Sequence, residues 1–352
     1  MAIRDVAVVG WGQTPSVRRS ADNEVQLLFK AIEDALEVAG MTRGDIDFTV
    51  GGSCDYLTGG PFAFVTNLEA TGAWPPIAES HVERDGAWAL YEAWVRLQQD
   101  DIDTALVFGS GKSSAIDPAA LYPQQMDPYY LQPIGIDPTS LAGLQARALI
   151  ETGGSTEREF AEVVARSHRA ALDNPNAQVR GETDVDSLLA GPYVRDPLRR
   201  HDLPPISDAA AAVVLVAGDR AGELSERPVW IRGIDHRVEP HQPGMRDLAT
   251  SPSTAKAAAK AGIHEGEVDV AEVSATFSPQ EPILRQALGL SASTVVNPSG
   301  GPLAANPVMS TGLIRIIEVA ARLASGEHHR GVAHATNGQC RQHNPVCALE
   351  TP

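Results

Sequence analysis

Short apolar runs closed by glycine alternate along the chain with longer segments whose apolar positions recur every three to four residues. The run Val6–Gly10 is β-branched and predicts a buried strand. The following segment, 25–39, places Leu28, Ile32 and Leu36 at helical spacing and stops before Gly40, which is typical of a helix C-terminus. The pattern therefore predicts a strand followed by a helix at the start of the chain.

The same reasoning extends to the rest of the chain. It predicts strands at 48–52, 104–109, 209–216, 229–233, 268–273, 331–336 and 346–350, and helices at 86–99, 156–171, 253–261, 280–288 and 311–324. Strand, helix and strand in this order imply right-handed crossovers and an α/β fold with a mainly parallel sheet covered by helices on both faces. The element order repeats after residue 226, which indicates two duplicated halves.

A stretch rich in proline and tyrosine interrupts this alternation after residue 112. Long excursions inside a sheet fold are usually lids or binding domains. We expect an N-terminal half at 1–112 and 204–225, a loop domain at 113–203, and a C-terminal half at 226–352.

Composition narrows the function classes. The chain has 352 residues and a formal net charge of −17, which argues against a nucleic-acid or anionic-membrane surface but leaves room for a local basic pocket. Its three cysteines are too few and too unevenly spaced for a disulfide framework or a four-thiolate zinc site, and no metal is expected. We found no leader, no apolar run of transmembrane length and no dinucleotide fingerprint. These features predict a soluble, cytoplasmic protein in a reducing compartment.

One glycine-rich turn carries the most specific pattern. The residues Asn297-Pro-Ser-Gly300-Gly301-Pro-Leu-Ala-Ala-Asn306-Pro lead into the apolar stretch 308–324. This turn resembles the one with which thiolases hold a catalytic histidine, in a Gly-His-Pro sequence, and Asn306 stands at the histidine position. Further segments that carry the resemblance lie at 8–15, 174–177, 206–215, 268–277 and 333–340.

Together, in this order and spacing, these segments resemble the lipid-transfer-protein (sterol-carrier-type) branch of the thiolase superfamily over nearly the full length. The resemblance implies a five-layered α/β/α/β/α thiolase fold, with two duplicated halves and an inserted loop domain that binds acyl-CoA. It also implies a dimer, formed either by two copies or with a related chain.

Three catalytic positions of that family are changed here. Alignment on the segment 86–90 puts Glu83 in the place of the nucleophilic cysteine, and a carboxylate cannot form the thioester that a Claisen reaction needs. Glu83 is interpreted either as a base or as a favourable charge at a helix N-terminus. Ser274 stands where the family has His or Asn. Asn306 can donate a hydrogen bond to an oxyanion but cannot take a proton.

Other candidate residues have two interpretations each. Cys340 and His343, in the last loop, are either a thiol and an imidazole facing the pocket or a buried cysteine and an exposed histidine. Cys54 follows a strand end and is interpreted as a core cysteine or as a residue near the pocket and the dimer interface.

The excursion adds further candidates. Its Tyr122, Tyr129 and Tyr130 are either substrate contacts or packing for an irregular loop. Gly300 and Gly301 are expected near the substrate, and Arg199 is either a phosphate contact or a solvated charge.

The changed set suits a reaction without a covalent intermediate. Retro-aldol cleavage of a β-hydroxyacyl-CoA needs a base for the β-hydroxyl and donors for the thioester carbonyl. Actinobacterial steroid side-chain aldolases, which the chain resembles, lack the cysteine and need a small zinc-ribbon/OB-fold partner. The resemblance thus implies a CoA-thioester aldol-lyase in steroid or lipid breakdown, with the thioester as substrate and no bound cofactor. The alternatives are a non-catalytic acyl-CoA-binding subunit and an acetyl-CoA acyltransferase that uses Cys340.

Overall fold

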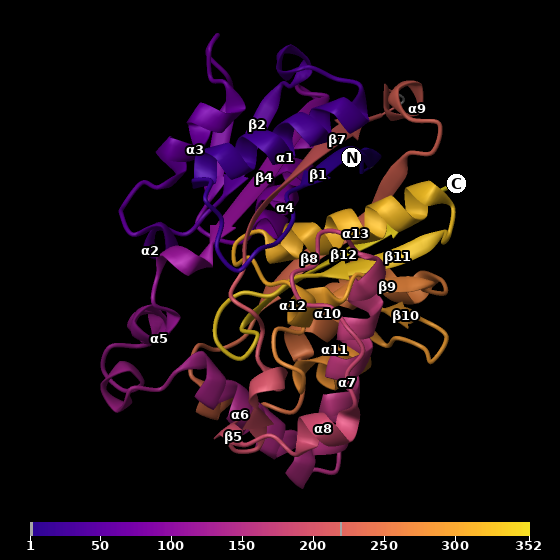
Figure 1. The fold of residues 1–352 in the computed structure, drawn as a ribbon. Coiled ribbons are helices and arrows are strands. Elements are labelled where there is room, and N and C mark those ends of the chain that lie inside the picture. Colours follow the sequence, from indigo (N-terminus) through magenta and orange to yellow (C-terminus); the bar gives the residue numbers. More distant parts are fainter. Residues whose placement is uncertain (1–2, 219) are drawn as a thin grey trace.

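Ten strands form one continuous mixed sheet in a computed structural model, which describes residues 3–218 and 220–352 (Figure 1). The first half contributes β1 (Val6–Gln13), β2 (Phe48–Gly52), β3 (Glu79–Val82), β4 (Thr104–Lys112) and β7 (Asp208–Ala217). The second half contributes β8 (Val229–Val238), β9 (Val270–Val273), β10 (Val295–Val296), β11 (Arg330–His334) and β12 (His343–Glu350).

The two halves have the same topology. The strand order is β10-β9-β11-β12-β8 in one half and β3-β2-β4-β7-β1 in the other. When the strands of each half are counted along the chain, the second strand is parallel to the third and to the fourth. The fifth strand is antiparallel to the fourth and to the first. The halves join where β1 meets β8, through the pairs Ala7–Trp230 and Val8–Val229. The predicted duplication is confirmed. The expectation of a mainly parallel sheet is wrong, because β7 and β12 pair antiparallel with both of their neighbours and β1 pairs antiparallel with β8.

Helices lie in three layers around the two halves of the sheet (Figure 1). The outer face of the first half is covered by α1 (Glu24–Ala39), with α3 (Phe64–Thr71) packed beside it. The central layer holds α4 (Gly86–Leu97) and α13 (Thr311–Ser325). The outer face of the second half is covered by α10 (Pro252–Lys260) and α11 (Gln280–Leu288). The expected five-layered fold is therefore confirmed.

The central layer is apolar because it packs against sheet on both sides. Its core cluster joins residues of both halves, including Val50 and Leu90 from the first and Val270 and Leu313 from the second. A helix that is apolar nearly all round belongs in such a position. The charged residues of α13 are paired: Arg315, 2% exposed, donates to the buried carboxylate of Glu272.

The excursion after β4 contains α5 (Pro118–Leu121), α6 (Pro138–Glu151), α7 (Glu157–Ala170), α8 (Val185–Leu189) and the small sheet of β5 (Tyr193–Arg195) and β6 (Leu198–Arg199). The short α2 (Asp55–Thr58), α9 (Arg220–Leu224) and α12 (Gly301–Ala304) complete the helices discussed below. The sequence analysis did not predict α3, α6 or β3. In α6 the start signal is the side chain of Asp137, which accepts the Ser140 N–H at 2.7 Å, with Pro138 in the first turn. Within the described residues, every helix is too short or too polar to cross a bilayer.

Candidate active site

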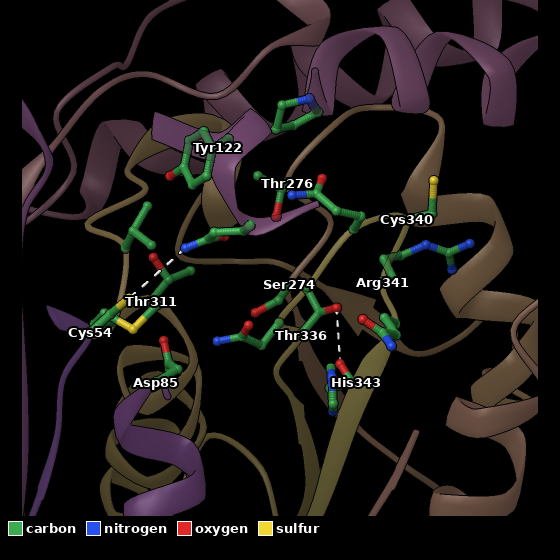
Figure 2. A pocket seen from close by; sticks show the side chains of 18 of the residues that line it. Cys54, Asp85, Tyr122, Ser274, Thr276, Thr311, Thr336, Cys340, Arg341 and His343 are labelled. Atoms are coloured by element: carbon green, nitrogen blue, oxygen red, sulfur yellow. Dashed lines mark hydrogen bonds between the residues drawn. The ribbon is translucent and has the colours of Figure 1, made fainter. Parts of the chain in front are cut away.

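A cavity of about 550 Å³ lies where α4 and α13 begin. Its walls come from the segments that precede these two helices, from the loop between β11 and β12, and from the start of the excursion. Figure 2 shows Cys54 and Tyr122 on one side of it, Cys340 and Arg341 on the other, and Ser274 and Thr336 between them. Of the predicted site residues, those that line it are Glu83, Tyr122, Ser274, Asn306, Cys340 and His343.

Asp85 forms part of the cavity wall and caps both central helices. Its Oδ1 accepts N–H bonds from Ala87 at 2.8 Å and Leu313 at 3.2 Å, and its Oδ2 accepts one from Gly312 at 2.9 Å. Burial raises the pKa of Asp85, while these N–H donors and Arg315 oppose that rise. Only glycine fits at 312, because a Cβ there would lie 2.4 Å from the Asp85 Oδ1.

Sequence reasoning missed Asp85 as a site residue. An aspartate directly before Gly86 is a visible N-cap signal for α4. Its second role, at α13, joins residues more than two hundred positions apart and becomes visible only when the halves are packed.

Glu83 lies at the exposed rim of the cavity. Its Oε1 accepts the Asp55 N–H at 2.6 Å, and its carboxylate is hydrogen-bonded by the thiol of Cys54. Burial, with the charge of Glu83, raises the pKa of Cys54 to about 11. Cys54 therefore lines the cavity as a protonated thiol at neutral pH.

Cys340 also keeps its proton. Its thiol donates to the Leu141 carbonyl at 3.8 Å and packs in an apolar cluster with Met126 and Leu141. Burial raises the pKa of Cys340 to about 11. A thiol becomes a nucleophile only as the thiolate. The cavity thus has two thiols and no thiolate at neutral pH.

Asn306 and Ser274 bring uncommitted polar atoms to the same cavity. The Asn306 Oδ1 accepts the Thr311 hydroxyl at 3.1 Å, while its Nδ2 has no hydrogen-bond partner within 3–218 and 220–352. The Ser274 side chain is 1% exposed, and its Oγ is likewise without a partner among those residues. Both can donate to an oxygen atom that enters the cavity.

His343 supplies an imidazole that is neutral at physiological pH. Burial and the charge of Arg84, followed by His236, Arg246 and His241, lower the pKa of His343 to about 4. Its Nδ1 is buried and has no partner in the described part of the chain. The backbone of His343 pairs with Asn337 in both directions, at 3.0 and 2.9 Å, which fixes the backbone of His343 at the cavity wall.

Behind Ser274 lies His334, which does not line the cavity. The Ser274 N–H approaches the His334 Nδ1 at 3.4 Å, and the His334 Nε2 lies 3.0 Å from the Asn344 Oδ1. The Asn344 Nδ2 donates to the Ser253 Oγ at 2.7 Å, so its Oδ1 is an acceptor and the Nε2 carries the proton. Burial lowers the pKa of His334 to about 3.

Of the three tyrosines predicted as substrate contacts, one lines the cavity and two do not. Tyr122 lines the cavity, and burial raises its pKa to about 12, which makes it a donor at neutral pH. Tyr129 and Tyr130 do not line the cavity, and they are 82% and 73% exposed.

The two glycines and Arg199 lie outside the cavity lining. Gly300 has φ +94°, and a Cβ on it would lie 2.6 Å from the Ala304 Cβ, so the turn needs glycine there. Arg199 donates to Glu157 at 2.5 Å and stacks on Tyr193.

A buried network holds the glycine turn that leads to Asn306. The Ser299 N–H and Oγ both donate to the Glu272 carboxylate, at 2.8 Å each, and Arg315 reaches the Ser299 Oγ at 2.6 Å. In the described part of the chain, no group of three or more His, Cys, Asp or Glu side chains is placed to hold a metal ion.

Comparison with known proteins gives a consistent set of relatives. No protein-family model matches the chain. An acetyl-CoA acetyltransferase of Methanothermobacter thermautotrophicus is 28% identical over 369 residues, which cover 96% of this chain and 95% of that protein. A 17-hydroxy-3-oxo-4-pregnene-20-carboxyl-CoA lyase of Mycobacterium tuberculosis is 24% identical over 254 residues, covering 67% of this chain and 64% of the lyase. Among solved structures, the Ltp2-ChsH2(DUF35) aldolase superimposes with a TM-score of 0.82 at 19% identity, covering 98% of this chain and 97% of the other.

Proposed function

The chain belongs to the thiolase superfamily, and we propose that it is a lyase that cleaves a β-hydroxyacyl-CoA by a retro-aldol reaction. The observation that supports this proposal is that one cavity contains both hydrogen-bond donors without partners among the described residues and thiols that keep their protons. Two uncommitted donors, the Asn306 Nδ2 and the Ser274 Oγ, share it with two thiols whose pKa values are raised to about 11. Such a cavity can bind a carbonyl oxygen and has no thiolate to attack it.

In the proposed reaction the thioester carbonyl oxygen accepts hydrogen bonds from Asn306 and Ser274. The Nδ1 of His343 takes the proton of the β-hydroxyl. The electron pair of that O–H bond forms the new C=O bond, the Cα–Cβ bond breaks, and its electron pair moves onto Cα as an enolate. The two donors stabilise the enolate oxygen. Return of the proton from His343 to Cα gives a shorter acyl-CoA and a ketone or aldehyde.

His343 is the proposed base because it lines the cavity and its buried Nδ1 has no partner in the described residues. Its lowered pKa keeps the imidazole unprotonated at neutral pH and makes it a weak base until a substrate is bound. The carboxylate of Glu83 is already hydrogen-bonded by Asp55 and Cys54. Tyr122, with its pKa raised to about 12, is a donor to the substrate oxygens rather than a base.

The names of two similar proteins support a narrower version of the proposal. One is a steroid CoA lyase, and the other is the Ltp2-ChsH2(DUF35) aldolase. We therefore propose a steroid or other lipid side chain as substrate, a dimeric assembly, and a zinc-ribbon/OB-fold protein as partner.

The second candidate is acyl transfer, because the relative with 28% identity is an acetyl-CoA acetyltransferase. Acyl transfer through a covalent intermediate requires a thiolate. Cys54 and Cys340 are the two thiols that line the cavity, and burial opposes ionisation of both.

The test is turnover of a β-hydroxyacyl-CoA by the full chain, alone and with its zinc-ribbon partner, followed by mass spectrometry of the products. We expect a shorter acyl-CoA plus a ketone or aldehyde. The variant Cys54→Ala/Cys340→Ala should keep most activity, as should the control Cys347→Ala, whose thiol is buried in β12 outside the cavity lining. Asn306→Ala should lower kcat roughly 100-fold, the usual effect of losing an oxyanion donor.

Other outcomes would decide against this reaction. Loss of all turnover in the double cysteine variant, with an acyl mass gain on Cys54 or Cys340 of the unmodified protein, would support acyl transfer. Tight thioester binding with no cleavage, alone or with the partner, would support a non-catalytic subunit.

A further inference from the structure

Arg341 is a buried charge with no role in the proposed reaction. Arg341 is 3% exposed and is one of the residues that line the cavity. In Figure 2 its guanidinium lies close to Cys340 and points away from Ser274 and Thr336. Its Nε and Nη1 are buried without hydrogen-bond partners, and within 3–218 and 220–352 it forms no ion pair. Burial lowers its pKa to about 10, so the guanidinium stays charged at neutral pH.

The neighbouring Arg246 shows what a structurally committed arginine looks like in the same place. Its Nη1 and Nη2 donate to the carbonyls of Cys340 and Gln339 at 3.1 and 3.0 Å, and it lies 3.8 Å from the Glu239 carboxylate, although its buried Nε has no partner in the described residues. That carboxylate also accepts bonds from Ser253. Glu239 therefore faces two buried guanidinium groups, and this end of the cavity has an excess of positive charge.

The backbone adds a second cost at the same point. Cys340 and Arg341 are consecutive non-glycine residues in the left-handed region, with φ of +51° and +55°. Such conformations are unfavourable for L-residues and tend to persist at functional sites. An unpaired buried charge is also unfavourable. Two unfavourable features in one loop indicate that the arrangement serves a ligand.

We propose that Arg341 binds a carboxylate on the acyl part of the substrate, so that the lipid-derived substrate is the CoA half-thioester of a dicarboxylic acid. A carboxylate matches a guanidinium in shape and charge and forms two parallel hydrogen bonds with it. The chain has a net charge of −17, so a local positive excess is selective for an anion at this point. The thioester part of this inference rests on the proposed function, whereas the anion site rests on Arg341 alone.

The phosphates of CoA are the other source of negative charge. They lie at the far end of the pantetheine arm from the thioester. A thioester carbonyl at Asn306 and Ser274 therefore places the acyl chain inside the cavity and the phosphates outside it. Because Arg341 is 3% exposed, the acyl chain is the part that reaches it.

The experiment measures binding of glutaryl-CoA, pentanoyl-CoA and CoA by calorimetry to the full chain, with free glutarate as a fourth ligand in thermal shift. Glutaryl-CoA and pentanoyl-CoA differ only in the terminal carboxylate. We expect glutaryl-CoA to bind roughly 10- to 100-fold more tightly, as expected for hydrogen bonds to a charged group. Arg341→Met should abolish this preference and leave pentanoyl-CoA binding unchanged, and Arg341→Lys should keep part of it.

Removing the unpaired charge should also raise the melting temperature of the free protein in Arg341→Met, a gain that a structural arginine would not give. The exposed Arg232, changed to Met, is the matched control and should alter neither quantity.

The results separate three cases. An unchanged preference for glutaryl-CoA in Arg341→Met, or an equal loss for both acyl-CoAs and CoA, would overturn the carboxylate site, the latter in favour of a phosphate contact. Stabilisation of the unmodified protein by glutarate, lost in Arg341→Met, without binding of any CoA compound would support the anion site while the proposed function fails. Cleavage of an uncharged acyl chain, with no preference for glutaryl-CoA, would leave the lyase and overturn the site.

Discussion

At the scale of single residues, the candidate site depends on groups held in their neutral forms by burial. His334 is fully buried behind Ser274 and hydrogen-bonded to Asn344, and its pKa is lowered to about 3. The imidazole therefore stays neutral down to strongly acid pH. Since an unfolded histidine titrates near pH ~6.5, the folded and unfolded states differ in bound protons over a wide range.

This difference gives a prediction for stability against pH. Below about pH 6.5, His334 is protonated in the unfolded chain but not in the folded chain. The free energy of unfolding therefore falls as the pH falls toward the pKa of the folded state. We expect this residue alone to cost about 2 kcal/mol between pH 7 and pH 5. His334→Gln should show a correspondingly shallower loss in urea titrations at these two pH values. Equal losses in both proteins would contradict the assignment.

At the scale of helices, the site depends on one carboxylate that starts two of them. The N-cap of α13, Ser310, makes no side-chain capping bond, and the first N–H groups of that helix point at Asp85 instead. Helix N-termini carry partial positive charge and favour an anion. Asp85 occupies that position, so a carboxylate lines the cavity at the N-termini of both central helices.

Asp85→Asn keeps the shape and turns one acceptor oxygen into a donor that faces an N–H. We expect a loss of about 2 kcal/mol or more in the free energy of unfolding, because a buried bond is replaced by a clash of donors. The control is Asp184→Asn at the exposed N-terminus of α8, where the aspartate accepts the N–H and the hydroxyl of Ser187. Its expected cost is below about 1 kcal/mol. Equal costs at both sites would argue against the double cap.

Local patterns explain which elements could be predicted. Helix α11 was predicted with its observed bounds, and α1 and α13 within one residue of theirs, because their apolar positions recur at helical spacing. The strand β3 is half-buried along its length and polar in sequence, so it lacks an apolar signal.

Some residues of the candidate site could likewise be found from the sequence, and others could not. Resemblance to a family led to Asn306 and Ser274, which share the cavity. Asp85 and Arg341 were missed because their importance comes from partners gained or lacking in three dimensions. No local pattern encodes that the Arg341 Nε and Nη1 lack a hydrogen-bond partner among the described residues.

At the scale of the whole molecule, one apolar layer belongs to both halves. Leu313 is fully buried in α13 and packs in a cluster that includes strands of each half. The strand junction between the halves is only two residue pairs long. Cohesion therefore comes from the helices between the sheets rather than from the sheet itself.

This arrangement predicts one cooperative unfolding transition for the two halves. Leu313→Ala should destabilise the protein by about 3 kcal/mol through the cavity it leaves. The unfolding midpoints measured by near- and far-ultraviolet circular dichroism should shift together. Leu144→Ala, at a half-exposed position of α6, should change the midpoint little. Two separated transitions in the variant would show that the halves unfold independently.

The capping of both α4 and α13 by Asp85 also makes the two halves of this duplicated protein depend on each other. Helices α4 and α13 hold equivalent places in the two repeats, each between the third and fourth strands of its half. Here the first repeat provides the carboxylate of Asp85, and the second repeat provides Gly312, which leaves space for that carboxylate. The symmetry is broken at the point where the repeats meet, and neither half alone contains both capped helices or the whole lining of the cavity.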